Sequence, residues 1–399
     1  MDQGGNATQT IRFVSGMDQV NPAEWDACVA DNSPFMRHAF LRALETGAVA
    51  VADRGYAPHH LLVRDGGGRL VGAAPLYFKS HSQAEIGSDF GWSLAHERAV
   101  GAYYPKLQVE CPACPNPGPR LLVRPDQNAA ALRTTLIAAL KDQVRTAGVS
   151  SVHVNFTSVE DWVALKQHGF LCDAGLRFVW TNRGYADFEQ FLADIKSDRR
   201  GMIRRERRDV HDSRLTFERL EGVDITAAFI EDFVPLYLST YEKYGTPSLF
   251  SSGMFQALRA GMSEQLMFQT ARLDGALVAA TMFMHDDRGL VAMHWGTRID
   301  KRFLHFELTY YQGIEFAIQR GFATLDVGPI GNHKAPRGFP AMPSLYAHWF
   351  ADEGFARMLA PGIARRMQTV RAKKAEVDLL SGFRRDLGCE AWPEAVDVI

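Results

Sequence analysis

Apolar residues recur along the chain with two spacings, one typical of helices and one typical of buried strands. Leu132, Leu136 and Leu140 lie four residues apart, which predicts a helix over 127–147. Similar patterns predict helices at 22–29, 38–46, 159–168, 188–210, 227–244, 252–260, 307–320 and 353–374. Short apolar runs between turn residues predict strands at 59–64, 70–78, 151–156, 177–185, 266–273, 277–285, 290–296, 323–328 and 346–350. The pattern therefore indicates a mixed α/β protein.

One series of elements is written twice in the sequence. Residues 66–78 and 273–284 each lead from a turn signal into a similar apolar run. Each copy is followed by a helical pattern that ends at a glycine, Gly148 in the first copy and Gly321 in the second, and then by another strand. Two copies of one α/β unit predict a pseudo-two-fold protein, with its site in the cleft between or beside the copies.

A long segment, 79–125, interrupts the first copy and has no clear periodicity. It is rich in glycine, proline and aromatic residues. Loops of this length inside a compact domain are usually functional or disordered, and the aromatic residues argue against disorder. We therefore expect this segment to contribute to function.

Composition and charge are those of a soluble enzyme with two domains of ordinary size. The chain has 399 residues, 46% hydrophobic and 23% charged, with a net charge of −2. This balance excludes a globally basic coat for nucleic acid, so no DNA partner is expected. The longest apolar stretch is too short to span a bilayer. The first ten residues lack a signal-peptide pattern, which predicts a cytoplasmic protein.

Cysteine usage does not indicate a disulfide scaffold or a metal site. There are five cysteines, and Cys111 and Cys114 form a lone C-P-A-C without a second ligand pair. The sequence also lacks a P-loop, an H-E-x-x-H motif and a G-x-S-x-G motif. No metal is predicted.

The order of predicted elements is that of the GNAT acetyltransferase fold, and several strings carry the resemblance further. They lie at 103–122, 199–210, 303–322, 333–339 and 344–350. These strings resemble the FemAB-like family of predicted N-acyltransferases, linked to peptidoglycan biosynthesis and recognition, over residues 15 to 375. One departure is Asn332, where the family has an acidic residue. The resemblance implies two tandem GNAT-like domains, 1–186 with the 79–125 insertion and 187–399 with the active site and a C-terminal helix.

Acyl transfer to an amine needs a donor site, a group that stabilises the oxyanion and an acceptor for the amine proton. Lys334 lies in a glycine-bracketed loop past a predicted strand, where ligands bind in α/β sheets. The segment also resembles the lysine-bearing segment of Fem ligases, which implies that Lys334 stabilises the oxyanion. A solvated loop lysine is the alternative. His305 and His333 are rival candidates for the proton acceptor, because histidine titrates near neutrality.

Further residues are predicted to bind substrate. Arg337 lies in the same string as Lys334. Glu307 lies at the start of the predicted helix 307–320 of the second copy, and electrostatic stabilisation of that helix N-terminus is its alternative role. The two tyrosines and the lysine of the 79–125 segment would form an aromatic and cationic wall; they are Tyr103, Tyr104 and Lys106. Packing of both tyrosines under the long loop is the alternative. By the resemblance to Fem ligases, Arg204 and Arg205 of the basic helix contact a phosphate group. A solvated basic face is the alternative.

Two kinds of acyl donor remain open. Neither predicted helix start, at 118–125 or 300–307, carries the glycine-rich grip on the coenzyme A pyrophosphate. The expected co-substrate is aminoacyl-tRNA, or acyl-CoA or another acyl thioester held differently, and no cofactor is expected to be tightly bound. The acceptor is a small-molecule or peptide amine, and tRNA is a candidate partner. A non-catalytic GNAT pair that binds a cell-wall or nucleotide-linked ligand is the alternative function. The sequence does not predict an oligomeric state.

Overall fold

The computed structural model of the chain describes residues 9–30, 33–82 and 89–384. Cys389 and the first eight residues, on which the signal-peptide prediction partly rests, lie outside the described residues. The described chain forms two compact units, and each contains a β-sheet and its own core. Unit 1 comprises 9–174 and 344–367, and unit 2 comprises 175–343 and 368–384.

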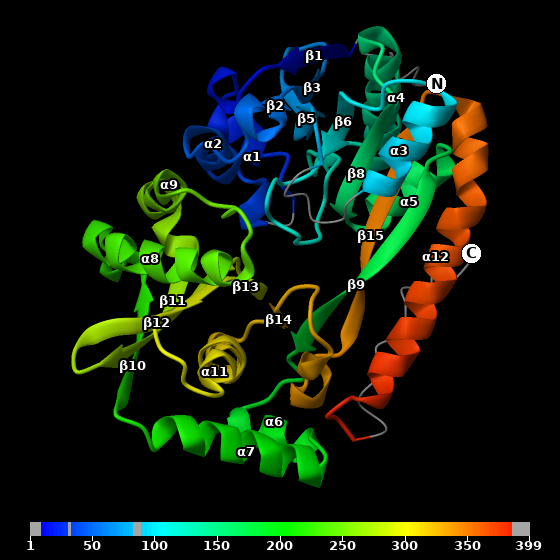
Figure 1. The fold of residues 1–399 in the computed structure, drawn as a ribbon. Coiled ribbons are helices and arrows are strands. Elements are labelled where there is room, and N and C mark those ends of the chain that lie inside the picture. The colour runs from blue at the N-terminus through cyan, green and yellow to red at the C-terminus, as the bar shows by residue number, and fades with distance from the viewer. Residues whose placement is uncertain (1–8, 31–32, 83–88, 385–399) are drawn as a thin grey trace, which may run out of the picture. The chain divides into compact units, whose positions relative to one another are not determined.

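Unit 1 contains short strands and several helices (Figure 1). Its strands are β1 Thr10–Val14, β2 Tyr56–Pro58, β3 His60–Arg64, β4 Leu70–Ala74, β5 Leu76–Lys79, β6 Lys106–Val109, β7 Leu122–Val123 and β8 Ser151–Thr157. Its helices are α1 Pro22–Asp26, α2 His38–Thr46, α3 Phe90–Ala99, α4 Ala129–Ala147 and α5 Val159–Gln167, with 3₁₀ turns η1 Met17–Gln19, η2 Pro34–Met36 and η3 Ala52–Arg54.

The strands of unit 1 form two groups. One group has the order β1-β3-β4-β7, and all its neighbours are antiparallel. In the other group β2, β5 and β6 are antiparallel, β6 and β8 are parallel, and residues 345–350 pair with β8 from the other side. The apolar stripe predicted for α4 packs on these strands, with Leu136 and Leu140 fully buried.

In unit 2, neighbouring strands follow the order β10-β11-β12-β13-β14-β9. The strands are β9 Leu171–Thr181, β10 Leu215–Glu221, β11 Leu266–Leu273, β12 Ala276–His285, β13 Gly289–Thr297 and β14 Thr324–Asp326. Neighbouring strands are antiparallel except β13 and β14, which are parallel. The chain passes between the units within β9, and again within β15 Ala341–Phe350.

Helices cover both faces of this sheet. They are α6 Phe188–Asp194, α7 Ser197–His211, α8 Ala227–Tyr244, α9 Ser252–Met262, α10 Leu304–Phe306 and α11 Gln312–Arg320, with 3₁₀ turns η4 Gly222–Asp224 and η5 Ser263–Gln265. In Figure 1, α8 and α9 lie on one side of the strands, and α7 and α11 lie on the other. Gly296 of β13 permits this packing, because a Cβ there would stand 2.1 Å from the carbonyl oxygen of Leu236 in α8.

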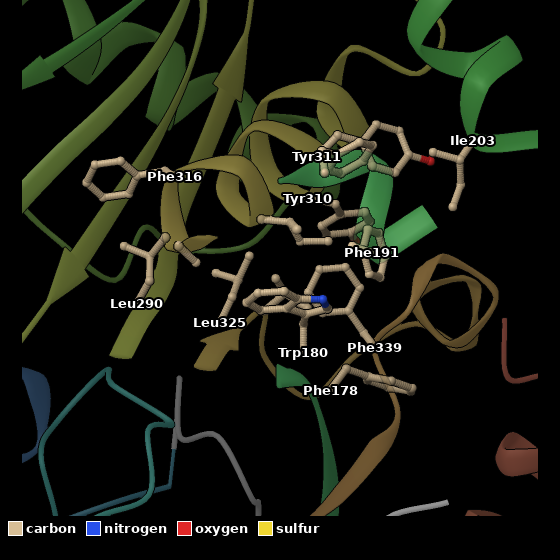
Figure 2. Packing of buried hydrophobic residues seen from close by; sticks show 14 of the residues in the cluster. Phe178, Trp180, Phe191, Ile203, Leu290, Tyr310, Tyr311, Phe316, Leu325 and Phe339 are labelled. Atoms are coloured by element: carbon tan, nitrogen blue, oxygen red, sulfur yellow. The ribbon is translucent and has the colours of Figure 1, made fainter. Parts of the chain in front are cut away.

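The core of unit 2 is dominated by aromatic side chains. Trp180, Phe191 and Phe339 are all fully buried and pack with Tyr310 and Tyr311 between α6, α11 and the strands (Figure 2). The last helix, α12 Glu353–Leu379, begins in unit 1 and ends in unit 2. No helix in the described part of the chain combines the length and apolarity needed to span a bilayer.

The sequence repeat has a structural counterpart in each unit. In unit 1, β5 and β6 are antiparallel and β6 and β8 are parallel; in unit 2, β12 and β13 are antiparallel and β13 and β14 are parallel. The helices that precede the parallel partners, α4 and α11, both end at a glycine in the left-handed conformation, with φ of 63° at Gly148 and 70° at Gly321. The two glycines therefore stop their helices as their spacing predicts.

Several elements differ from the sequence prediction. The predicted strand 70–78 is divided into two at Pro75, and the predicted helix 188–210 is divided at 195–196, where Ile195 is extended. The predicted loop 79–125 contains α3, β6 and β7. The units also do not coincide with the predicted division at 186/187, since residues 345–350 pair with a strand of unit 1.

Candidate functional site

Unit 2 contains a cavity of about 450 Å³ beside its parallel strand pair. That volume suits a small-molecule ligand. The walls come from the end of α8, the middle of β12 and β13, the start of the α10–α11 segment and the loop after β14. The lining residues are Lys243, Tyr244, Thr281, Ala292, Met293, His294, Trp295, His305, Phe306, Thr309, Tyr310, Val327, Ile330, His333 and Lys334.

Two local features of the backbone form this cavity. Residues 307–311 form a π-helical turn before α11, an element that often marks functional sites. After β14 the chain passes Gly328 and Gly331, whose φ values of 80° and 108° allow a sharp change of direction into the 3₁₀ turn η7 Asn332–Arg337. Together they bring His305, His333 and Lys334 to one cavity, although the first is far from the others in sequence.

Lys334 is buried at the wall of the cavity, with 6% of its surface exposed. Its Nζ donates hydrogen bonds to the carbonyl oxygens of Val327 at 2.5 Å and Gly328 at 3.2 Å. Burial lowers the pKa of Lys334 to about 8, and the negative charge of Asp326 only partly opposes this. Lys334 is therefore mostly protonated at pH 7 and mostly deprotonated once the pH rises above about 8.

His305 lies on the same cavity wall and is held in place by a chain of hydroxyl groups. Its Nδ1 is 3.1 Å from Oγ1 of Thr309, which is 2.9 Å from Oγ1 of Thr281. The indole ring of Trp295 packs edge-on against it, with ring centroids 4.9 Å apart. Burial, and then the charge of Lys334, lowers the pKa of His305 to about 3, so this ring is neutral at physiological pH.

His333 is exposed at the edge of the cavity. Its Nε2 is 3.1 Å from the hydroxyl of Tyr310, and its ring stacks on Phe306 with centroids 5.5 Å apart. Burial of part of the ring and the charge of Lys334 lower the pKa of His333 below its ordinary value of 6.5. A neutral histidine in contact with solvent can both accept a proton and release it to water.

Arg337 and Glu307, both predicted to bind substrate, adjoin the site but do not line the cavity. Arg337 forms a bidentate ion pair with buried Glu206 of α7, at 3.0 and 2.5 Å, and donates to the carbonyl oxygen of His333 at 2.6 Å. This contact ties the loop that carries Lys334 to α7.

Glu307 is fully buried under the π-helical turn. Arg207 donates to both of its carboxylate oxygens, at 3.1 and 3.0 Å, and His211 contacts it at 2.9 Å. The spacing of the basic residues places them on all sides of α7, and Arg207 lies on the side that faces the protein. The predicted substrate-binding roles of Glu307 and Arg337 stay predictions.

Arg204 and Arg205 lie on the exposed side of α7, away from its buried residues. Arg204 pairs with exposed Glu189 of α6. The structure does not bring these arginines to the cavity walls.

The remaining predicted residues, Tyr103, Tyr104 and Lys106, gather around Asp89 in unit 1. Asp89 accepts hydrogen bonds from Lys106 Nζ at 2.6 Å, Tyr103 Oη at 2.5 Å and Tyr104 Oη at 3.3 Å. Burial disfavours the charged carboxylate, but the charges of Lys106 and His153 and the hydrogen bonds from Lys106 and Ser82 together outweigh it, so the pKa of Asp89 is lowered. Tyr103 and Lys106 are buried and Tyr104 is half-buried, so they form an internal polar cluster.

Sequence reasoning missed several cavity residues. Thr281 lies inside an apolar strand, so its position suggests a core residue. Thr309 lies four residues after the predicted site residue His305 but was not itself predicted. His294, buried in β13 with Nε2 unpartnered in the described chain, could have been found by the two-residue alternation of that strand. No group of three or more His, Cys, Asp or Glu side chains in the described residues is placed to hold a metal ion.

Comparison with known proteins identifies one matching family and several similar solved structures. The FemAB-like family, described as peptidoglycan biosynthesis/recognition, matches residues 16–385. Similar solved structures include FemX, at 12% identity and TM-score 0.55, covering 86% of this chain and 98% of that one. Another is the C-terminal domain of a putative lysylphosphatidylglycerol synthetase from Agrobacterium fabrum, at 11% identity and TM-score 0.53, with 86% and 95% covered. No curated protein matches the sequence.

These identities show the fold alone. A conserved protein of unknown function from Bacteroides thetaiotaomicron is similar too, at 10% identity and TM-score 0.51, with 85% of this chain and 99% of that chain covered. The predicted fold class, a mixed α/β fold of tandem GNAT-like domains resembling Fem ligases, is confirmed.

Proposed function

The chain belongs to the FemAB-like family, and from that premise we propose that it transfers an acyl or aminoacyl group to an amine in the unit 2 cavity. The observation that carries the proposal is Lys334, a buried ammonium group on the cavity wall beside two neutral histidines. The family resemblance supplies the type of reaction, and the cavity supplies the groups that the reaction needs.

The chemical step follows from that arrangement. The acceptor nitrogen attacks the acyl carbonyl carbon, and the carbonyl electrons move to oxygen. Lys334 Nζ donates a hydrogen bond to this oxyanion, and the group that carried the acyl chain leaves with its bonding electrons as the carbonyl re-forms. The nitrogen, positively charged after attack, gives up a proton to a base. A donor aimed at the oxyanion is worth about 3–4 kcal/mol of barrier.

We assign the base role to His333 rather than His305. The pKa of His305, about 3, makes it too weak a base to hold the amine proton at neutral pH. His333 is exposed and can pass its proton to water. His305, oriented by Thr309, then acts as a neutral hydrogen-bonding group for the bound substrate.

The donor is an aminoacyl-tRNA or an acyl thioester, and the acceptor is a small-molecule or peptide amine. Aminoacyl-tRNA and acyl-CoA both carry phosphate. The exposed arginines of α7, Arg204 and Arg205, offer a surface that attracts phosphate. No tightly bound cofactor is needed for either donor, and a cytoplasmic location would give access to both.

Reconstitution tests the proposal. Purified protein is incubated with a radiolabelled amino acid, tRNA and synthetase, in parallel with a panel of acyl thioesters, and a set of amines is offered as acceptors. We expect label in an amide product. Loss of transfer after ribonuclease treatment would choose the tRNA donor. Saturable ligand binding without transfer from any donor would instead favour the non-catalytic GNAT pair.

A further inference from the structure

The buried carboxylates around the unit 2 cavity form ion pairs with arginines. Three buried carboxylates lie behind its walls, and each faces an arginine. Glu206 pairs with Arg337 and Glu307 with Arg207. Asp326 pairs with Arg177 and also accepts a hydrogen bond from the backbone of Gly328 at 2.9 Å. These carboxylates are therefore already neutralised.

The two lysines of the cavity have no such partner in the part of the chain that the structure describes. Among the described residues, no carboxylate stands within ion-pair distance of Lys334 or Lys243, although pairs of this kind are frequent elsewhere in unit 2. The described residues that line the cavity include these two lysines and three histidines, but no aspartate or glutamate. A buried cation without a counter-charge is costly unless a ligand supplies one.

The positions of the two lysines separate their roles. Lys334 lies in the wall beside His305, where the proposed oxyanion forms. Lys243 is exposed in the last turn of α8, so an oxyanion at Lys334 gives no account of it. Beside Lys243 stand Tyr244, 71% exposed, and Ile330, 82% exposed; both are large side chains that line the cavity while open to solvent.

From this arrangement we propose that one substrate of the cavity is an amphipathic anion. Its carboxylate or phosphate pairs with Lys243 at the cavity edge and is attracted by the positive charge of Lys334, and its apolar body packs on the aromatic walls. The inference rests on the proposed function and narrows its substrate class. The apolar body contacts Trp295 and Phe306 inside the cavity and Tyr244 at its edge. The anionic group supplies the charge that the lining residues lack.

Binding of matched probes tests the proposal without turnover. Titration calorimetry compares 3-phenylpropionate, 2-phenylethyl phosphate and the neutral 3-phenylpropionamide on the full chain at pH 7. We expect at least one anion to bind about tenfold or more tighter than the amide, because charge-assisted hydrogen bonds are the stronger kind. The better of the two anions identifies the natural group as carboxylate or phosphate.

Three variants give the test its specificity. Lys334→Met and Lys243→Met should each reduce the preference for the anion while leaving the affinity of the amide unchanged. Lys373→Met removes an exposed lysine of α12 that pairs with Glu376, and should keep the full preference. Since Lys243 is exposed, its replacement does not endanger folding.

The proposal is overturned if neither anion binds saturably, if the amide binds as tightly as both anions, or if both lysine variants retain the preference. These outcomes are separable from failure of the proposed function. Acyl transfer without anion preference would remove this inference alone. Anion preference without acyl transfer from any donor would remove the proposed reaction and leave the site.

Discussion

Each unit contains a buried lysine near its parallel strand pair, and the two lysines differ in what surrounds them. In unit 1, Lys106 is 1% exposed and donates to Asp89 at 2.6 Å. In unit 2, Lys334 is 6% exposed and donates only to the carbonyl oxygens of Val327 and Gly328 among the described residues. One cation is neutralised inside the protein, and the other faces a cavity whose described lining residues include no carboxylate.

Under the proposed function, this difference separates a structural lysine, Lys106, from a reactive one, Lys334. Asp89 also accepts hydrogen bonds from Tyr103 and Tyr104, so the unit 1 cluster is satisfied internally. Lys334 keeps a desolvated charge that a substrate can use, and perturbed groups of this kind cluster at functional sites. The duplicated fold thus offers a control within one chain.

The largest effect on stability is expected in unit 1. Lys106→Met should lower the free energy of unfolding by about 3–5 kcal/mol, because it leaves Asp89 charged and unpaired in a buried position. Denaturant unfolding measures this. Adding Asp89→Asn to Lys106→Met should recover much of the loss. If Lys106→Met is as stable as wild type, the ion pair is not structural and the contrast between the units fails.

The pH dependence of turnover should reveal the unpaired lysine of unit 2. Asp326 favours the charged form of Lys334, and His305, His333 and Arg337 share its surroundings. Since only the protonated lysine stabilises an oxyanion, turnover should fall about tenfold per pH unit above pH 8. Turnover should also fall at acid pH, once the pH is low enough to protonate His333, whose pKa lies below its ordinary value of 6.5.

Hydroxylamine is a suitable acceptor for the alkaline part of this profile, because it is unprotonated there and does not add its own titration. The residual rate of Lys334→Met should lack the alkaline decline. An alkaline decline that persists in that variant would assign the titration to another group.

The hydroxyl chain behind His305 should have a smaller effect. Thr309→Val keeps the shape of the side chain and removes the hydrogen bond to His305 Nδ1. A neutral hydrogen bond contributes about 1 kcal/mol, so kcat should fall about fivefold with little change in KM. Thr297→Val, in β13 and outside the cavity walls, is the control. An unchanged kcat would mean that His305 needs no such orientation.

The smallest effect is expected on the exposed face of α7. Replacing Arg204 and Arg205 with alanine should raise KM a few-fold for the substrate that carries phosphate, at low salt only, because added salt screens exposed charges. Arg357→Ala, an exposed arginine of α12, serves as control. Wild-type constants for both substrates at low salt would show that this face is merely solvated.

Elements with strong periodicity were predicted well from the sequence. The helices at 38–46 and 227–244 and the strand at 266–273 have the observed bounds, since apolar spacing alone decides them. Strand β6 was missed, because it is only four residues long and lies in a segment rich in glycine and proline. Burial of Lys106 depends on Asp89, which sequence periodicity does not reveal.

The candidate site was predictable only in part. Loop position and family resemblance identified Lys334, His305 and His333, and the structure brings all three to one cavity. Thr309 lies four residues after His305, the spacing of neighbours on a helix, but the predicted helix began only at residue 307 and so left His305 outside it. The partners of Glu307 and Arg337 come from α7, about a hundred residues away, and such long-range pairs have no local pattern.

The most direct test of the contrast between the two lysines is Lys334→Met, measured for both turnover and unfolding. Turnover should fall about 100- to 1000-fold, the range for loss of one oxyanion donor. Stability should not fall with it. In the folded protein the pKa of Lys334 is about 8, against 10.5 when the side chain is exposed. Below pH 8 its buried charge therefore lowers the free energy of unfolding. Between pH 8 and 10.5 the folded state loses this proton before the unfolded state does, so the free energy of unfolding rises.

At pH 7 the free energy of unfolding of this variant should therefore equal or exceed that of the wild type, within about 1 kcal/mol for the two hydrogen bonds that are lost. Near-normal turnover by the purified, folded variant would contradict the account, because it would leave the unit 2 lysine without a part in the reaction.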